Sequence, residues 1–293
     1  MHSYTKGYVI RYVNYYGFLS AYRDEKYKYQ YKKEKRLEIP QKMVVMQNKR
    51  LLKENPPSSG EKIIIDGKKC VLGERIKSSS DGHIYHLDNG VFAKIYRKEF
   101  CDKFHMDKCS YMIRKHITDT QICWPRQLIY SIQGEFIGYT FDQYEGVELQ
   151  KSVLKKAGLK QYFPKWQKQQ LTLTILKIIQ RIHKENILLG CIDLKTIIVK
   201  DEETVYFTEI DKYQIDGYPC LSRNYIFFPP EIMKYKEKIF LFNEITENYE
   251  IAVLVFMLMM PGITPYAQRG KRSNMSQIRE FPYPLGENNS KNL

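Results

Sequence analysis

Hydrophobic and polar positions follow two different periods along the chain. Between residues 62 and 96, short apolar runs alternate with turn signals such as Asp66-Gly67, which predicts short strands joined by tight turns. The segments that follow predict one helix and two further strands, over 100–117, 122–131 and 134–146. We expect this part of the chain to form a small domain of five strands and one helix.

Helical periodicity dominates the second half. Apolar residues recur at helical spacing over 171–187, and residues 248–260 are apolar nearly all round, which indicates a buried helix. Residues 188–215, between the two, predict a loop, a strand, an acidic turn and a second strand. The longest strongly apolar run, 251–260, is too short to cross a bilayer, so we expect no membrane span.

Composition places the chain among globular proteins. Its 293 residues are 43% hydrophobic and 27% charged, which fits neither a disordered nor a fibrous protein. The six cysteines form no C-x-x-C pair, which argues against a disulfide framework or a structural zinc site. The N-terminus shows no apolar segment typical of a secretion signal. These features predict a cytoplasmic, reducing location.

Positive charge is concentrated at the N-terminus. The net charge is +14, and residues 1–60 hold 13 Lys/Arg against 5 Asp/Glu, interleaved with many tyrosines. Basic residues among aromatics can contact phosphates and stack on bases, so nucleic acid or another anionic surface is one candidate partner. A solvated extension whose tyrosines pack on the main domain is the other interpretation. The segment 54–62 (ENPPSSGEK) predicts a linker.

The order of elements and the motifs at their joints resemble the protein kinase fold. The similar segments are VFAKIY (91–96), ICWP (122–125), FIGYTF (136–141), FFPPE (227–231) and ENYEIAVLVFMLMMPGITPY (247–266). More narrowly, the chain resembles bacterial kinase-like domains with GDIN, NFLV, FIDTDSFQI and PPE segments, over residues 70–283.

This resemblance implies an α+β, bilobal protein kinase-like fold. The expected parts are a basic extension with linker over 1–60, a small β-rich N-lobe over 61–146, a mainly helical, shortened C-lobe over 147–283 and a disordered tail over 284–293.

The resemblance also implies ATP and Mg²⁺ as ligands. Lys94, within VFAKIY, matches the lysine that contacts the phosphates of ATP. The glycine-rich flap that should cover those phosphates aligns with Lys77, Ser79 and Gly82, so only its third glycine is kept. Because side chains hinder close backbone approach to phosphates, the substitutions weaken nucleotide binding, while serine can partly replace glycine.

The catalytic loop aligns with the family in two registers. In one, Cys191 takes the position of the proton acceptor, Thr196 that of the magnesium asparagine and Glu209 that of the magnesium aspartate. In the other, Asp193 is the proton acceptor and Asp211 the metal ligand. The spacing is the same in both registers, and strand phasing favours the first. Neither register restores the complete set of residues for phosphoryl transfer.

Supporting residues of the family are also changed. In the family a glutamate on the first helix pairs with the lysine, and Asp107 is the acidic residue nearest to that position in this sequence. Asp107 can also be interpreted as an exposed acid on the helix surface. Glu247 stands where the family has an aspartate that braces the catalytic loop, and His183 is interpreted as a packing residue.

Three hypotheses follow for the function. The first is a pseudokinase that retains a nucleotide site and acts as a regulatory or binding module for an unidentified protein partner. The second is an active, atypical Ser/Thr protein kinase that transfers the γ-phosphate of ATP with Asp193 and Asp211. The third is a nucleic-acid-associated module that acts through its basic N-terminus.

Overall fold

The computed structural model describes residues 43–44, 49–88, 90–152, 165–229, 239–260 and 265, without the side chains of 152, 165 and 166. Three predicted features lie outside the described residues: the tyrosine-rich N-terminal segment, the last two residues of the PPE motif and the C-terminal tail. The chain forms two compact units. The sheet unit comprises Val44–Gly146 and Tyr206–Lys212, and the helical unit comprises Val147–Val205 and Tyr213–Leu293 with Met1–Met43.

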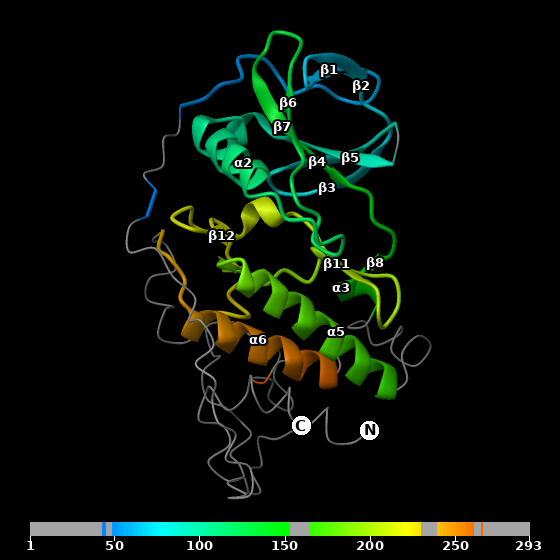
Figure 1. The fold of residues 1–293 in the computed structure, drawn as a ribbon, viewed down its shortest axis with the longest axis vertical. Helices are drawn as coiled ribbons and strands as arrows, with labels where there is room; N and C mark the ends of the chain where they lie inside the picture. Colours follow the sequence, from blue (N-terminus) through cyan, green and yellow to red (C-terminus); the bar gives the residue numbers. More distant parts are fainter. Residues whose placement is uncertain are drawn as a thin grey trace, which may run out of the picture. The chain divides into compact units, whose positions relative to one another are not determined.

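A curled antiparallel sheet organises the sheet unit (Figure 1). Its strand order is β2-β1-β6-β7-β5-β4-β3, and each neighbouring pair is antiparallel. The prediction of five strands is wrong, because the β1–β2 hairpin pairs with β6 through β1 and extends the sheet to seven strands. The strands are β1 (Lys62–Ile65), β2 (Lys68–Val71), β3 (Arg75–Ser78), β4 (Gly82–Leu87), β5 (Val91–Tyr96), β6 (Gln127–Tyr130) and β7 (Phe136–Asp142).

Local sequence explains the turns and the close strand spacing. The β1–β2 turn is formed by Asp66 and Gly67, both with positive φ (48° and 73°), as the predicted hairpin requires. In β7, a Cβ atom added to Gly138 would lie 1.9 Å from the carbonyl oxygen of Lys94. Glycine at 138 therefore lets β7 pass closely beside the centre of β5.

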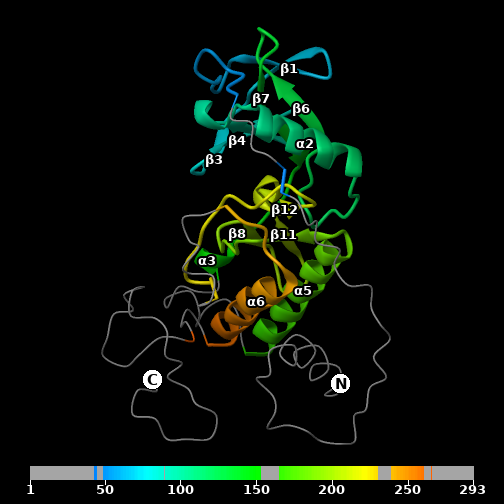
Figure 2. The ribbon, with the colours of Figure 1, turned by 90° about the vertical axis from the view of Figure 1, so that its left-hand side faces the viewer.

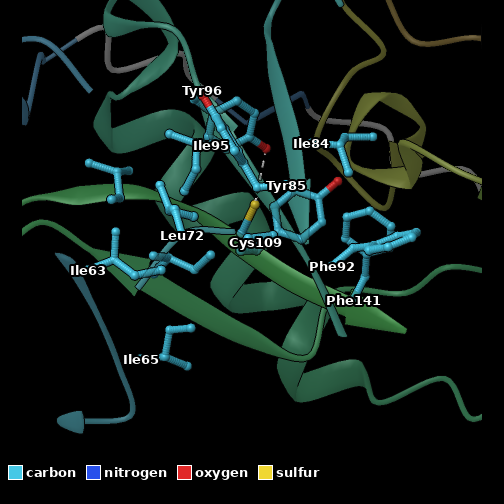
Figure 3. Packing of buried hydrophobic residues seen from close by; sticks show 14 of the residues in the cluster. Ile63, Ile65, Leu72, Ile84, Tyr85, Phe92, Ile95, Tyr96, Cys109 and Phe141 are labelled. Atoms are coloured by element: carbon cyan, nitrogen blue, oxygen red, sulfur yellow. Dashed lines mark hydrogen bonds between the residues drawn. The ribbon is translucent and has the colours of Figure 1, made fainter. Parts of the chain in front are cut away.

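The core of the sheet unit lies between the sheet and one helix. Helix α2 (Lys103–Lys115) is capped by the Asp102 carboxylate and packs against β6 and β7, after the short 3-10 helix η2 (Lys98–Phe100). Figure 3 shows the Tyr96 hydroxyl directed to the Cys109 thiol, 3.4 Å away, among the buried apolar side chains. Leu52 also belongs to this core, so the chain before the predicted linker is built into the unit.

The helical unit is organised by two helices that lie side by side in both views (Figures 1 and 2). Helix α6 (Glu244–Met259) begins with a capping box between Asn243 and Thr246 and is apolar along most of its length, as predicted. The other elements of the helical unit are α3 (Leu149–Ser152), α5 (Lys165–Lys184), β8 (Val147–Glu148), β9 (Ile187–Leu188), β10 (Ile197–Val199) and β12 (Gln214–Ile215). Strand β11 (Val205–Phe207) continues into the sheet unit, where the 3-10 helix η3 (Ile210–Lys212) follows.

The prediction of an α+β protein is confirmed. An antiparallel sheet with one helix forms the first unit, and α5 and α6 dominate the described part of the second. None of the helices within the described ranges is long and apolar enough to cross a membrane.

Candidate functional site

Lys94 lies at the centre of a buried group of charges in the sheet unit. Its ammonium nitrogen donates to Asp81 Oδ2 at 2.7 Å and to both carboxylate oxygens of Asp211, at 2.8 and 3.0 Å. Glu209 Oε2 lies 3.8 Å from the same nitrogen. The Lys94 side chain is only 1% exposed, so these acidic groups, rather than water, compensate its charge.

Two tyrosines complete the surroundings of Asp211. Tyr96 donates to Oδ2 and Tyr139 to Oδ1, both at 2.6 Å. Strand geometry places them there: Tyr96 is two residues after Lys94 in β5 and shares its face, and Tyr139 is directly opposite Lys94 in β7. Each oxygen of the Asp211 carboxylate therefore receives one phenol and the Lys94 ammonium.

Two further lysines balance the outer carboxylates. Lys212 contacts Asp81 Oδ1 at 3.1 Å and also pairs with Glu209 Oε2. Lys77 lies 3.2 Å from Glu209 Oε1. Three carboxylates thus face three ammonium groups, a formal net charge of zero. We call this set the charge cluster: Lys77, Asp81, Lys94, Glu209, Asp211 and Lys212.

Contacts within the charge cluster hold Asp81, Lys94, Glu209 and Asp211 in their ionised forms. Burial alone would raise the pKa of Asp81, but the Lys94 and Lys212 ammonium groups outweigh it and hold that pKa far below its usual value. Burial alone would lower the pKa of Lys94, but the surrounding carboxylates, led by Asp211, raise it well above the usual range. Burial likewise opposes the lowered pKa values of Glu209 and Asp211, which Lys94 produces.

The turn between β3 and β4 positions Asp81. Ser79 donates its backbone N–H to the Gly82 carbonyl at 2.8 Å and its hydroxyl to Asp81 Oδ1 at 2.6 Å. Arg97 donates its backbone N–H to the Asp81 carbonyl at 2.8 Å. A Cβ atom at Gly82 would lie 2.5 Å from the Ile95 carbonyl oxygen, so glycine here serves the packing of β4 on β5. The turn is therefore a rigid support for a carboxylate that faces Lys94.

The predicted catalytic loop belongs to the helical unit. Cys191 is buried in an apolar cluster with Leu188, Cys220 and Phe242, and contact with Cys220 together with burial raises the pKa of its thiol above the usual value. A buried, protonated thiol is a poor proton acceptor for a substrate hydroxyl. Cys191 is therefore poorly suited to accept a proton.

The alternative base, Asp193, takes part in a local turn. Its carboxylate accepts from the Lys195 backbone N–H at 2.9 Å, and its carbonyl accepts from the Thr196 hydroxyl at 2.9 Å. Asp193 is half-buried and Thr196 is buried. These contacts give both residues a role in shaping the turn before β10.

Helix α6 braces this loop from below through Glu247. One oxygen of the fully buried Glu247 carboxyl accepts from the Leu189 backbone N–H at 2.7 Å, and the other accepts from the Gly190 N–H at 2.9 Å. His183 Nε2 lies 3.2 Å from the first oxygen. Glu247 therefore holds the backbone of the loop, as we expected of the bracing acid at this position. His183 contacts the same carboxyl group.

The structure brings together only some of the predicted site residues. Lys94, Glu209 and Asp211 lie in one cluster, with Ser79 and Gly82 in the adjoining turn of the same unit. The loop residues are in the helical unit. Asp107 pairs with Lys103 one helical turn away, at 2.8 Å, and this contact supports its interpretation as a helix-surface acid.

Sequence reasoning missed four members of the site: Asp81, Tyr96, Tyr139 and Lys212. The period-two pattern of β5 could have placed Tyr96 beside Lys94. An acidic residue directly before Gly82 was a signal for Asp81, because the phosphate-covering flap that the resemblance implies would not be expected to carry a negative charge at this position. The register of β7 is a tertiary feature, so the sequence carried no comparable signal for Tyr139. The i,i+3 spacing of Glu209 and Lys212 was a local signal for that ion pair.

Magnesium does not fit this arrangement. Within the part of the chain that the structure describes, no group of three or more His, Cys, Asp or Glu side chains is placed as metal ligands would be. The carboxylates of the charge cluster are near one another, but lysine ammonium groups or tyrosine hydroxyls contact their oxygens. A divalent cation would have to displace these cations before it could bind.

Comparison with known proteins adds no family to this description. No protein-family model matches the chain, and no curated protein sequence matches it.

Acidification is expected to destabilise the sheet unit. The pKa values of Asp81, Glu209 and Asp211 are lower in the folded unit than their usual values of 3.8–4.5. Their stabilisation is therefore complete above about pH 5 and is lost as pH falls through about 4 towards the folded pKa values. Each group that takes up a proton on unfolding contributes a slope of about 1.4 kcal/mol per pH unit.

Urea unfolding at pH 7, 5, 4 and 3 measures this effect. Asp81→Asn, which removes one such carboxylate, should show a shallower acid dependence than the unmodified chain. Identical slopes for the two proteins would contradict the role of Asp81.

Proposed function

We propose that this chain is a protein-kinase-like binding module, a pseudokinase, that does not transfer phosphate. The observation that carries the proposal is that lysines neutralise both carboxylates that could bind the metal. Glu209 is the candidate metal ligand in one register, and it pairs with Lys212 and Lys77. Asp211 is the candidate metal ligand in the other register, and it pairs with Lys94. Phosphoryl transfer requires a metal aspartate that is available to Mg²⁺. The proposal therefore does not depend on the choice of register.

The loop chemistry supports the same proposal. Cys191 is a buried thiol with a raised pKa, which cannot replace an ionised carboxylate as a proton acceptor. The Glu247 brace keeps the loop ordered even without this catalytic group. A retained scaffold with a lost reaction is what a regulatory or binding module for a protein partner would need.

An active Ser/Thr kinase is the second candidate. Lys94 pairs with Asp211 at 2.8 Å, and the register with Asp193 and Asp211 would need this lysine–aspartate pair. The candidate requires that Asp211 release Lys94 and both tyrosines when a metal binds.

A phosphotransfer assay with radiolabelled ATP separates the two candidates. The purified chain is incubated with ATP and either Mg²⁺ or Mn²⁺, alone and with a general protein substrate, beside the Asp193→Asn variant. We expect incorporation no greater than in the protein-free blank, and equal for both proteins. Label that enters the unmodified chain or the substrate, and is lost in Asp193→Asn, would establish the kinase instead.

A further inference from the structure

Two cysteines of the helical unit lie side by side. Cys191 and Cys220 belong to one buried apolar cluster, and their thiols are hydrogen-bonded to each other. A Cβ atom added to Gly190 would lie 2.6 Å from the Cys220 Cβ and 3.4 Å from its sulfur. The Cys220 side chain therefore packs directly on the residue before Cys191. Both cysteines are free thiols in this structure.

Strand pairing explains this contact. Leu188 in β9 pairs with Gln214 in β12. After β12, Ile215 and Tyr218 exchange backbone hydrogen bonds at 2.9 and 3.1 Å, and this exchange reverses the chain. The segment after β12 therefore returns towards the loop after β9, and each of the two carries one of the cysteines.

The backbone on both sides of Cys191 is held in place. Glu247 accepts from the Gly190 N–H at 2.9 Å, and the side-chain amide of Asn224 donates to the Ile192 carbonyl at 2.9 Å. Asn224 belongs to the segment after β12, so this hydrogen bond already joins that segment to the loop. Because the two backbones are fixed beside each other, a bond between the sulfurs requires little further ordering of the chain.

A small oxidant reaches this pair through Cys191. Cys191 is 7% exposed, whereas Cys220 has no exposed area. The contact with Cys220 and burial raise the pKa of the Cys191 thiol above its usual value, so little of the reactive thiolate is present. We therefore expect a slow reaction, and one that needs an oxidant as small as hydrogen peroxide.

We propose that Cys191 and Cys220 form a reversible disulfide when hydrogen peroxide oxidises them, and that this bond fixes the segment after β12 to the loop after β9. The inference does not rest on the proposed function, because it involves neither a nucleotide nor phosphate transfer. Disulfides of this kind in a reducing compartment are typically transient and redox-sensing.

The reaction takes two steps. The Cys191 thiolate attacks one peroxide oxygen, the O–O bond breaks, and Cys191 becomes a sulfenic acid, while the released hydroxide takes up the proton that the thiol lost. The Cys220 sulfur then attacks the sulfenic sulfur, the S–OH bond breaks, and the hydroxide leaves with the Cys220 proton as water. The two thiols together lose two electrons, and the peroxide is reduced to two molecules of water. Dithiothreitol reverses the reaction and is itself oxidised to a disulfide.

Peptide mapping by mass spectrometry tests the inference. The full chain carries Cys70→Ser, which removes a half-buried thiol that could join two copies. It is incubated with millimolar hydrogen peroxide for several hours, its remaining thiols are blocked, and it is digested without reductant. We expect peptides joined through Cys191 and Cys220 after oxidation, and none before it or after dithiothreitol.

Hydrogen exchange measures what the bond does to the loop. The amides of Leu189 and Gly190 should exchange about tenfold or more slowly in the oxidised chain, because the disulfide restricts local opening of the loop. Treatment with dithiothreitol should restore the original rates.

Matched variants separate this pair from the other thiols. Cys123→Ser removes a buried cysteine of the sheet unit and should leave both the bond and the slower exchange intact. Cys191→Ala and Cys220→Ala each remove one sulfur, so peroxide should produce neither effect in them. If Cys220→Ala unfolds, as its melting curve would show, the Cys70→Ser chain and Cys191→Ala still decide the inference.

Two results would overturn the inference. The first is a folded chain without the Cys191–Cys220 bond after peroxide treatment, whether its thiols stay reduced, form other disulfides or become sulfinic acids. The second is a bond that forms but leaves exchange at Leu189 and Gly190 unchanged, which would mean that the disulfide does not fix the loop. Neither result affects the phosphotransfer assay, so the pseudokinase proposal stands or fails separately.

Discussion

Replacement of Lys94 by methionine is expected to lower the free energy of unfolding of the sheet unit by about 3–5 kcal/mol. Methionine has a similar length and fills the same space, but it leaves Asp81, Glu209 and Asp211 with only two lysines. Because the Asp211 carboxylate is buried, water cannot replace the missing ammonium. The loss should therefore appear without nucleotide.

A second substitution tests whether charge imbalance is the cause. Lys94→Met leaves a net charge of −1 in the cluster, Asp211→Asn alone leaves +1, and the double variant returns to zero. We expect the double variant to be more stable than the sum of the single losses predicts, by about 1–3 kcal/mol. Strict additivity would mean that the two groups act independently and would contradict the pairing.

Tryptophan fluorescence during urea unfolding provides the measurement. The chain has two tryptophans, and Trp124 is fully buried in the sheet unit, where its indole N–H donates to the Met112 carbonyl at 2.8 Å. A Trp166→Phe background therefore leaves one reporter in the sheet unit. Lys69→Met, on the exposed part of β2, serves as the control and should change stability by no more than about 0.5 kcal/mol.

Replacement of Glu247 by alanine is expected to lower the free energy of unfolding of the helical unit by about 3 kcal/mol or more. The change leaves the backbone N–H groups of Leu189 and Gly190 without their acceptor, and each buried unpaired donor costs about 1–3 kcal/mol. His183 loses its contact as well. Glu247→Gln keeps one carbonyl oxygen and should cost less than alanine.

Hydrogen exchange locates this effect. The amides of Leu189 and Gly190 should lose protection in Glu247→Ala, while the midpoint of urea unfolding, followed by helical circular dichroism, moves to lower urea. Glu244→Gln, in the first turn of the same helix, is the control and should cost less than about 1 kcal/mol. Unchanged protection at both amides would mean that Glu247 does not brace the loop.

Part of the candidate site followed from local sequence. Lys94 was predicted at the centre of a strand, and the structure places it there, in β5. Glu209 and Asp211 were proposed as alternatives in two registers, and the structure brings both to Lys94, so the spacing argument could not have separated them. The interpretation of Asp107 as a partner of Lys94 failed because the Lys94 charge is compensated by Asp81 of the β3–β4 turn and Asp211 of η3 instead.

The turn between β3 and β4 shows a different limit of sequence reasoning. Comparison with a glycine-rich pattern directed attention to Ser79 and Gly82 as residues that approach a phosphate. In the structure, Gly82 permits close contact with the Ile95 carbonyl, and Ser79 orients Asp81. Asp81 stands between them in the sequence, yet its importance depends on the lysines that face it.

The sequence by itself determined the order and type of most elements, although not the number of strands in the sheet, because periodicity, turn residues and helix caps act between neighbours in the chain. The Asp66-Gly67 hairpin and the buried helix α6 are examples. Only the tertiary structure decided the charge cluster. Lys94 and Asp211 are 117 positions apart, and their contact depends on how β5, β7 and η3 pack. Such pairing rests on the compensation of buried charge, which acts through space and leaves no period in the sequence.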